Sequence, residues 1–378
     1  PKCAFIILRQ LPMKHWNIGK LSDLCILKRG YDLPIYAREQ GNVPIYSSSG
    51  ISGYHNESKC ISPGVITGRY GTIGTVFFAK DDFWPLNTTL FVENFNGNDE
   101  KFIYYFLKTL EWEKYNDKSA VPGINRNDVH KETIYYPDVK EQKAIAAVLG
   151  SLDDKIDLLQ RQNATLEAMA ETLFRERFIS YSHKDSMVAI DSYILFNPKR
   201  SIRKGDMSPY LEMSNLRTDA FCPIEFYDKE FTSGSKFING DTLLARITPC
   251  LENGKKCFVN FLEDGAVAWG STEYIVMHPM DELHPLFAYC LVKTDDFRGY
   301  AESCLSGSSG RQRVDVTHLK QYEIKSPRKN DINDFNRFCT AIEPKLLNNY
   351  KKIKTLEKLR DTLLPKLMSG EVRVRVDG

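Results

Sequence analysis

The residue types that could support catalysis stand together at positions 137–143. Asp138, Glu141 and Lys143 are the kinds of side chain that a metal-dependent nuclease uses. That chemistry places its carboxylates and lysine on neighbouring strands around a metal ion. Here the apolar spacing that follows predicts that Glu141 and Lys143 begin a long helix, with Asp138 just before it. Acidic residues are stabilised at the positive end of a helix dipole, so the pattern favours helix initiation over a nuclease site.

Other signatures of enzymes and metal sites are missing from the sequence. It contains no GxxxxGK[ST] loop for a nucleotide phosphate, and the segment nearest to an amino-methyltransferase motif, Asn197-Pro198-Lys199, lacks the second proline and the aromatic residue. The 9 cysteines include no CxxC pair, and the 7 histidines include no HxxxH spacing. Scattered cysteines of this kind indicate reduced thiols in a cytoplasmic protein. We expect no catalytic residue, metal or cofactor in this chain.

A glycine-rich loop at 66–74 (ITGRYGTIG) has the chemistry to contact DNA. Its glycines permit tight turns, and Arg69 and Tyr70 project from between them. Arginine can bind guanine O6 and N7 or a phosphate, and Thr67 and Tyr70 can bind phosphates. A plain β-hairpin with an exposed arginine explains the same residues equally well. A related segment at 245–256 keeps an arginine, Arg246, and adds two lysines, which favours the DNA interpretation.

Three further loops carry side chains suited to DNA. The segment 46–56 is small, polar and aromatic, and it either follows a groove or is a solvated loop. The segments 122–127 and 307–313 each present arginine with Asn or Gln, and we expect them to occupy equivalent places in two repeated units. The candidate DNA-binding residues of the first half are Ser48, Tyr54, Thr67, Arg69, Tyr70, Asn87, Asn125 and Arg126. Those of the second half are Asn215, Arg246, Thr248, Asn253, Lys255, Lys256, Ser271, Thr272, Arg311, Gln312 and Arg313.

Two long helices must position these loops. Apolar residues recur in alternating steps of three and four from Ile145 to Leu173, and the pattern returns 190 positions later from Phe335 to Leu363. This heptad spacing predicts two helices that bury their apolar stripes against each other as an antiparallel intramolecular coiled coil. Asn163 and Asn349 lie on the seam, where they either fix the pairing register or border solvent. The predicted helix-pairing residues are Leu152, Ile156, Leu159, Asn163, Leu166, Leu346, Asn349, Ile353 and Leu356.

The blocks outside the helices also repeat. The segment 61–66 parallels 238–243, and Trp84 with its following residues parallels Trp269, in the same order along the chain. Short β-branched and aromatic runs between turns predict mixed α/β (α+β) units. We therefore predict a pseudo-twofold tandem repeat in four parts: a recognition domain at 1–140, a spacer helix at 141–180, a second recognition domain at 181–330, and a second spacer helix with the C-terminal tail at 331–378.

Composition sets few limits on function. The 378 residues are 42% hydrophobic and 26% charged, which is ordinary for a soluble globular protein. The net charge of +2 neither demands nor excludes nucleic acid, so any DNA interface must come from local patches. The apolar run at 4–8 is too short for a signal or membrane segment, and we expect a cytoplasmic protein.

Taken in order, these motifs resemble those of the specificity subunits of Type I restriction–modification systems, over essentially the whole chain. No single string is decisive, but the ordered set on a duplicated frame is specific. The matching segments are Trp16 with 21–24 and 29–30, then 66–74, 85–90, 123–126, 141–146, 149–156 and 363–372. Pro344 inside the second helix is a departure that leaves the straightness of that helix open.

The resemblance implies a non-catalytic subunit with two target-recognition domains, each reading one half of a split site in double-stranded DNA. It implies that the helices set the length of the unread spacer and dock two methylation subunits, to which translocating restriction subunits are added. S-adenosylmethionine, ATP and Mg²⁺ would then belong to those partners. Two other classes stay open: a coiled-coil scaffold without a DNA role, and a stand-alone DNA methyltransferase or nuclease.

Overall fold

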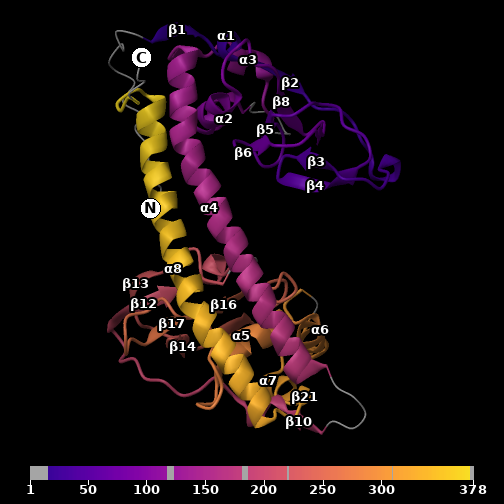
Figure 1. The fold of residues 1–378 in the computed structure, drawn as a ribbon, viewed down its shortest axis with the longest axis vertical. Coiled ribbons are helices and arrows are strands. Elements are labelled where there is room, and N and C mark those ends of the chain that lie inside the picture. Colours follow the sequence, from indigo (N-terminus) through magenta and orange to yellow (C-terminus); the bar gives the residue numbers. More distant parts are fainter. Residues whose placement is uncertain (1–15, 117–122, 181–185, 219–220, 309, 375–378) are drawn as a thin grey trace. The chain divides into compact units, whose positions relative to one another are not determined.

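The computed structural model describes residues 16–116, 123–180, 186–218, 221–308 and 310–374 (Figure 1). The chain divides into two compact units, one of residues 1–156 and 355–378 and the other of residues 157–354. The apolar run at 4–8 and Pro122 lie outside the described residues. Within the described part, no helix is both long enough and apolar enough to cross a membrane.

The first unit is built on an antiparallel four-stranded sheet of order β2-β8-β5-β6. Helix α2 packs against β5 and β6, and its first turn is capped by Asp99, whose carboxylate accepts the Phe102 N–H at 2.8 Å. A second sheet of order β4-β3-β7 and the β1-β9 pair complete the unit. Its elements are β1 (Asn17–Lys20), α1 (Leu21–Leu24), β2 (Ile26–Arg29), η1 (Ile35–Ala37), β3 (Val43–Ser47), β4 (Gly50–His55), β5 (Gly64–Gly68), β6 (Val76–Ala79), β7 (Trp84–Pro85), β8 (Thr89–Asn94), α2 (Glu100–Lys108), η2 (Trp112–Tyr115), α3 (Arg126–His130) and β9 (Thr133–Tyr136).

The second unit has the same plan. Its central sheet has the order β11-β18-β15-β16, and helix α5 packs against β15, β16 and β18. A four-stranded sheet of order β13-β12-β17-β14 corresponds to the β4-β3-β7 sheet, and β10-β21 corresponds to β1-β9. Its elements are η3 (Arg175–Ile179), β10 (Met187–Ala189), η4 (Ile190–Ser192), β11 (Ile194–Phe196), β12 (Met207–Leu211), η5 (Met213–Asn215), β13 (Tyr227–Glu230), β14 (Ser235–Phe237), β15 (Thr242–Ala245), β16 (Lys256–Phe258), β17 (Ala268–Gly270), β18 (Tyr274–Pro279), α5 (Leu286–Lys293), α6 (Asp295–Ser303), β19 (Leu305–Ser306), β20 (Arg313–Val314), α7 (Val316–Leu319) and β21 (Glu323–Lys325).

The matching strand orders confirm the predicted duplication and the mixed helix and strand fold class. The match extends to single residues. Gly68 pairs with Thr89 at the end of β5, and Ala245 pairs with Tyr274 at the end of β15. These are the residue equivalences that the sequence repeats predict for the central strands. Arg69 and Arg246 therefore leave the two sheets at the same point.

Two long helices, α4 (Val139–Phe174) and α8 (Lys329–Met368), contribute one segment each to both units. In the first unit Arg360 Nη1 of α8 donates to Asp153 of α4 at 2.9 Å. In the second unit Asn349 Nδ2 of α8 donates to Asn163 Oδ1 of α4 at 2.9 Å. Residue numbers rise along one helix as they fall along the other, so the predicted antiparallel pairing is confirmed. Helix α8 continues through Pro344.

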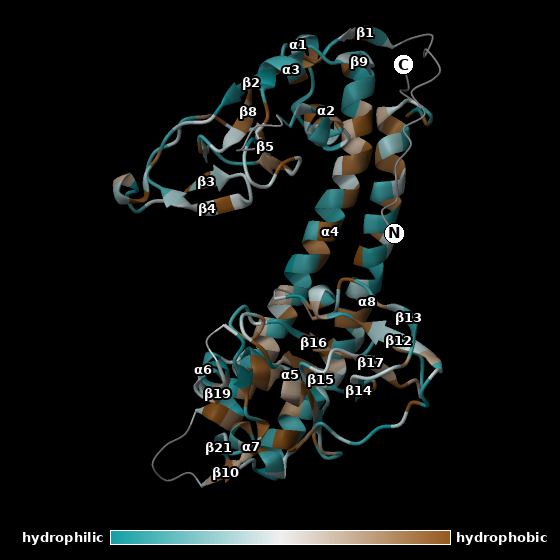
Figure 2. Cartoon of the chain, turned by 180° about the vertical axis from the view of Figure 1, so that it is seen from behind, coloured by the Kyte–Doolittle hydropathy of each residue, from teal (hydrophilic) through white to brown (hydrophobic). Residues whose placement is uncertain are grey.

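Apolar burial holds each unit around its helices. In Figure 2 hydrophobic and hydrophilic residues alternate along α4, as a one-sided apolar stripe requires. All nine residues predicted to pair the helices are buried or half-buried. The core of the first unit includes Ile145, Leu149 and Leu367, and that of the second includes Phe174, Phe335 and Leu346.

A tyrosine in each unit anchors the short helix to α4. Tyr105 of α2 donates its phenol hydrogen to Asp153 at 2.6 Å, and Tyr289 of α5 donates to Glu167 at 2.8 Å. Burial first, and then the neighbouring carboxylate, raise the pKa of both phenols well above its usual range. Both hydroxyls therefore stay protonated and act as donors at any physiological pH.

Candidate nucleic-acid interface

The loop after β5 carries the first group of candidate residues. The backbone N–H groups of Arg69 and Tyr70 both donate to the Thr88 carbonyl, at 2.9 and 3.2 Å. The Arg69 carbonyl in turn accepts the Ile124 N–H at 3.0 Å. The guanidinium carbon of Arg69 lies 4.4 Å from the centre of the Tyr70 ring. The loop is thus fixed by backbone bonds on both sides, while its arginine and tyrosine are half-exposed.

Gly123 allows Tyr70 to take this position. A Cβ atom on Gly123 would lie 2.1 Å from the Tyr70 ring, closer than any real contact. Asn125 then caps α3 by accepting the Asn127 N–H at 3.0 Å, and Arg126 follows, exposed, in the first turn. Tyr70, Asn125 and Arg126 are therefore brought to the same loop cluster.

The other candidate DNA-binding residues of the first unit differ in how far their side chains are exposed to solvent. Ser48 lies beside this loop, with its Oγ 3.3 Å from where a Gly71 Cβ would be, and Tyr54 on β4 is 56% exposed. Asn87 Nδ2 donates to the Asp32 carboxylate. Thr67 is 1% exposed, and its hydroxyl has no hydrogen-bond partner within the described part of the chain. Thr67 belongs to the core of the sheet and does not reach the surface in this structure.

The second unit repeats the same backbone arrangement after β15. The Arg246 N–H donates to the Glu273 carbonyl at 2.8 Å, and the Arg246 carbonyl accepts the Val314 N–H at 3.0 Å. Arg246 Nε also donates to the Val314 carbonyl at 3.0 Å. Thr248 is closely tied to Gln312, whose N–H its hydroxyl accepts at 3.1 Å. Four candidates, Arg246, Thr248, Gln312 and Arg313, therefore meet at one sheet end.

The side chain of Arg313 forms a paired contact with Glu273. Its Nε lies 2.9 and 3.0 Å from the two carboxylate oxygens, and its Nη2 lies 2.7 Å from Oε1. The hydrogen bond to Glu273 raises the pKa of Arg313. The side chain of Arg313 is 48% exposed and that of Glu273 is 22% exposed. A half-exposed arginine is thus held in one orientation.

The structure corrects one sequence-based equivalence. Arg126 and Arg313 do not occupy the same place. Gly123 bridges Tyr70 in the first unit where Arg313 bridges Ile247 in the second. The cap of α3 is Asn125 and that of α7 is Asp315, so Asp315 matches Asn125. The loops that precede these two capping residues differ in length. The short arginine motifs of the two loops therefore cannot be aligned residue by residue.

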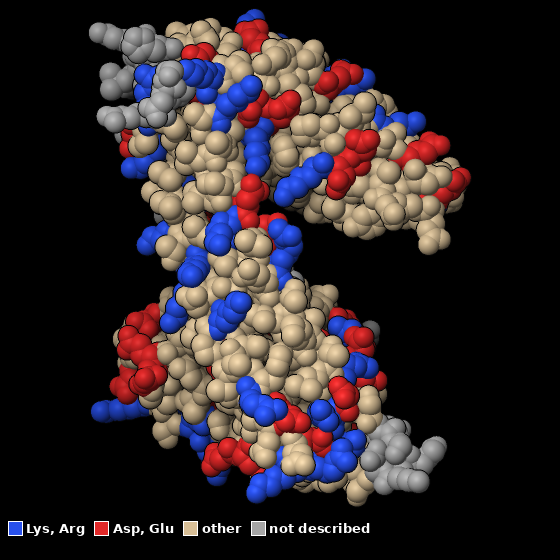
Figure 3. Space-filling model, viewed as in Figure 1, with Lys and Arg blue, Asp and Glu red and all other residues tan. Residues whose placement is uncertain are grey.

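Charge is spread over both units. In Figure 3 the Lys and Arg side chains of the visible face are interspersed with Asp and Glu and do not form a single positive field. This agrees with the net charge of +2. Individual placements, not a global potential, must therefore carry any argument for DNA contact.

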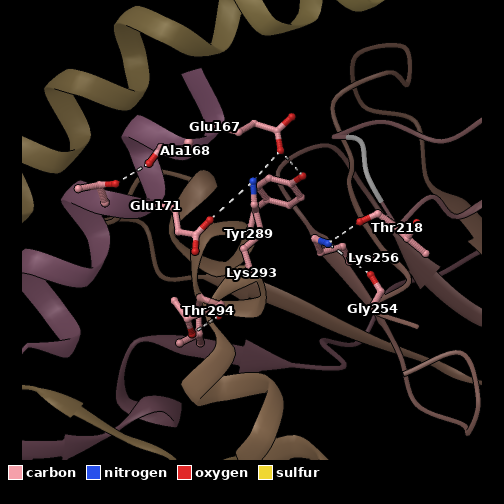
Figure 4. Close-up of polar contacts among 11 residues, drawn as sticks. Glu167, Ala168, Glu171, Thr218, Gly254, Lys256, Tyr289, Lys293 and Thr294 are labelled. Carbon is pink, nitrogen blue, oxygen red and sulfur yellow. Dashed lines mark hydrogen bonds and ion pairs between the residues drawn. The ribbon is translucent and has the colours of Figure 1, made fainter. Parts of the chain in front are cut away.

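The two candidate lysines of the second unit face different ways. Lys255 Nζ donates to the Met213 carbonyl at 3.0 Å. Lys256 Nζ donates to the Thr218 and Gly254 carbonyls at 3.1 and 3.3 Å, and it lies near Lys293 of α5 (Figure 4). Burial, followed by the charge of Lys293, lowers the pKa of Lys256. Lys256 therefore lies against the helix side of the sheet, with its ammonium group directed at backbone carbonyls.

The remaining candidates are placed as follows. Ser271 Oγ accepts the Glu273 N–H at 3.1 Å, which stiffens the turn before β18. Asn215 is buried, whereas Asn253, Thr272 and Arg311 are exposed. The sequence repeats aligned Thr88 with Glu273, yet neither was among the candidates. Thr88 and Glu273 lie opposite the loop arginines Arg69 and Arg246. Their alignment in the two repeats is the signal that could have identified them as candidates.

Comparison with known proteins gives consistent results. Residues 13–168 match the family model described as the Type I restriction modification DNA specificity domain. The specificity subunit of the Type I restriction enzyme MjaIX from Methanocaldococcus jannaschii is 26% identical over 337 residues, which cover 80% of this chain and 76% of that protein. The specificity subunit of the HindI enzyme from Haemophilus influenzae is 22% identical over 399 residues, covering 82% and 85%.

A solved structure shows the same fold. The crystal structure of a Type I restriction–modification S subunit from M. genitalium superposes with a TM-score of 0.59 at 17% identity, over 96% of this chain and 98% of that one. At this identity the match concerns the fold alone. It covers both units and the two long helices.

Proposed function

Because the chain belongs to the family of Type I restriction–modification specificity subunits, we propose that it is the DNA-recognition subunit of such a system and that it is not itself a catalyst. Each unit reads one half of a bipartite site in double-stranded DNA. The observation that carries this proposal is the repeated loop frame. Arg69 and Arg246 are presented from equivalent backbone positions, with different neighbours around them.

The chemistry of the loops fits base and backbone contacts. Arginine can donate two hydrogen bonds to guanine, and asparagine or glutamine can do so to adenine. Exposed side chains of this kind are Arg126 in the first unit and Arg311 in the second, with Arg313 half-exposed beside it. Thr88, next to Arg69, has a buried hydroxyl without a hydrogen-bond partner among the described residues. Because backbone hydrogen bonds hold these loops in place, their side chains can contact DNA without a large rearrangement of the loops.

The remaining parts of the proposal concern assembly. The subunit acts with other subunits of a restriction–modification complex in the cytoplasm: two methylation subunits and translocating restriction subunits, which bind S-adenosylmethionine, ATP and Mg²⁺. The recognition domains are residues 1–140 and 181–330, and the helices at 141–180 and 331–378 set the spacer and dock the methylation subunits. The duplicated recognition loops favour this function over a scaffold, and family membership favours it over a stand-alone methyltransferase or nuclease.

The proposal is tested by mapping methylated bases in DNA from cells that express this chain with its methylation subunit. We expect a split motif, two short defined blocks around a fixed run of unread bases, that disappears when this chain is deleted. The reason is that each unit reads one block while the helices set the gap. Replacing Arg126 by Ala should relax only one block. Methylation that is independent of this chain would contradict the proposal.

A further inference from the structure

The contact between Glu273 and Arg313 uses only one edge of the guanidinium group. A guanidinium has five N–H donors, arranged on a side edge formed by Nε and one terminal nitrogen and on an end edge formed by the two terminal nitrogens. Glu273 takes the side edge, through Nε at 2.9 Å and Nη2 at 2.7 Å. Among the residues that the structure describes, no hydrogen bond uses the donors of Nη1 or the second donor of Nη2. The end edge of Arg313 is therefore available to a ligand within this part of the chain.

Both members of the pair stand on fixed backbone. The Glu273 N–H donates to Ser271 Oγ at 3.1 Å, and the Glu273 carbonyl accepts the Arg246 N–H at 2.8 Å. Arg313 is the β-bridge partner of Ile247, and the next residue, Val314, donates its N–H to the Arg246 carbonyl at 3.0 Å. The orientation of the guanidinium is consequently set by backbone bonds at the sheet end.

A contribution to folding stability does not explain why Glu273 and Arg313 are paired. Ion pairs with this degree of exposure contribute little to folding stability, because water and salt screen them and ordering two long side chains costs entropy. A carboxylate near a DNA surface also opposes binding, since it repels phosphates. Its effect is to restrain the arginine before any ligand arrives, which lowers the entropy lost on binding.

The first unit has no such pair at the equivalent place. Thr88 stands where Glu273 does, and Gly123 stands where Arg313 does. The space over Gly123 is filled by the ring of Tyr70. The paired arginine is thus a feature of the second unit and does not belong to the shared frame.

We infer that Glu273 is a positioning residue that holds Arg313 with its end edge toward the DNA, so that the second unit reads a guanine through Arg313. The inference rests on the proposed function and deepens it. Guanine presents O6 and N7 as two acceptors in the major groove, which match two parallel N–H donors. Lysine keeps the charge, but its three N–H donors radiate from one rotating ammonium and do not form a planar pair of parallel donors.

The experiment uses the complex of this chain with its methylation subunit and a randomised DNA library, with sequencing of the bound fraction. For Arg313→Ala and Arg313→Lys we expect loss of a guanine preference at one position, in the half-site of the second unit only. The loss should be roughly 5- to 150-fold in discrimination, as for one bidentate contact. For Glu273→Gln, which keeps one acceptor, we expect a smaller loss at the same position. The salt dependence of binding should stay unchanged. Arg203→Ala, at an exposed arginine of the second unit that is not among the candidate DNA-binding residues, serves as the matched control.

Three outcomes would overturn the inference. Equal weakening for all sequences, with a shallower salt dependence, would make Arg313 a phosphate contact. An unchanged preference in both Arg313→Lys and Glu273→Gln would make the pair a surface ion pair. A loss confined to Arg313 variants would remove the positioning role of Glu273. If the unaltered complex bound all sequences alike, the proposed function itself would fail, which is a separate result. Arg313→Lys keeps the charge and decides the question even if Glu273→Gln does not assemble.

Discussion

The recognition loops of the two units have the same backbone bonds and different side chains. Arg69 and Arg246 each donate their N–H across the sheet end and each accept an N–H from the segment before α3 or α7. Around them, Tyr70 over Gly123 in one unit is replaced by the Glu273–Arg313 pair in the other. Backbone hydrogen bonds do not depend on side-chain identity. The frame can therefore stay constant while the contacts offered to a ligand change.

The helix-packing cores differ in the same way. In the second unit Phe174, Phe178, Phe287 and Phe335 form a cluster of tilted and edge-to-face rings with centres 4.9–6.0 Å apart. The corresponding positions in the first unit are Leu364, Met368, Phe102 and Ile145, which belong to its core. The same pair of helices can thus pack against either aromatic or mainly aliphatic side chains, because both kinds exclude water and fill similar space.

The largest effect is expected from truncating this core. Phe335→Ala should lower the free energy of unfolding of the second unit by about 3–5 kcal/mol, because a fully buried ring is lost and a cavity remains. Phe335→Ile, which imitates Ile145 of the first unit, should cost less. Hydrogen exchange resolved by unit provides the measurement. Leu359→Ala, at a side chain that is 44% exposed, should change stability by no more than about 0.5 kcal/mol. Equal costs for Phe335→Ile and Phe335→Ala would contradict the comparison.

A second prediction concerns the position where the two loops differ most. Gly123→Ala should destabilise the first unit by about 1–3 kcal/mol, because the new methyl group would stand 2.1 Å from the Tyr70 ring. Arg313→Ala, at the equivalent position, should be nearly neutral for stability. Thermal unfolding measures both. The double variant Tyr70→Ala with Gly123→Ala should recover most of the loss, and a failure to recover would show that the ring is not the obstacle.

The smallest effect is a pH dependence confined to the first unit. His130 Nε2 accepts the Leu27 N–H at 2.9 Å, so the neutral ring is the folded form, and burial followed by the charge of Arg126 lowers its pKa from 6.5. Below about pH 6.5 the unfolded chain binds a proton that the folded chain binds only at lower pH. Stability is therefore complete above that pH and should decrease as the pH falls toward about 5. The corresponding position of the second unit is Lys320.

The control for this prediction is His130→Gln, which can still accept the Leu27 N–H through its side-chain oxygen but does not titrate. Thermal unfolding between about pH 7.5 and 5 should show a flatter profile for this variant. An identical slope in both proteins would assign the pH dependence to other groups.

The helices and the duplication follow from the sequence because their rules are local. A heptad spacing predicts a helix wherever it occurs, and two copies of it 190 positions apart can cover each other's apolar stripe. Asn163 and Asn349 lie on the seam as that spacing predicts, whereas the hydrogen bond between them is known only from the structure. The equivalence of Arg69 and Arg246 follows from repeated strands of similar length. Each of these conclusions needs only spacing along the chain.

The side chains that form the recognition surface could not be predicted from spacing along the chain. Whether Thr67 points into the core depends on which side of β5 the second layer covers. Lys256 is bound on the helix side of the sheet, where its ammonium group donates to backbone carbonyls. Glu273 meets Arg313 across 40 positions of chain. Such contacts arise only when distant segments pack, since neither segment alone carries a signal of the other's approach. The sequence determined the frame and its repetition, and the packing of the sheet ends selected the side chains that can reach a ligand.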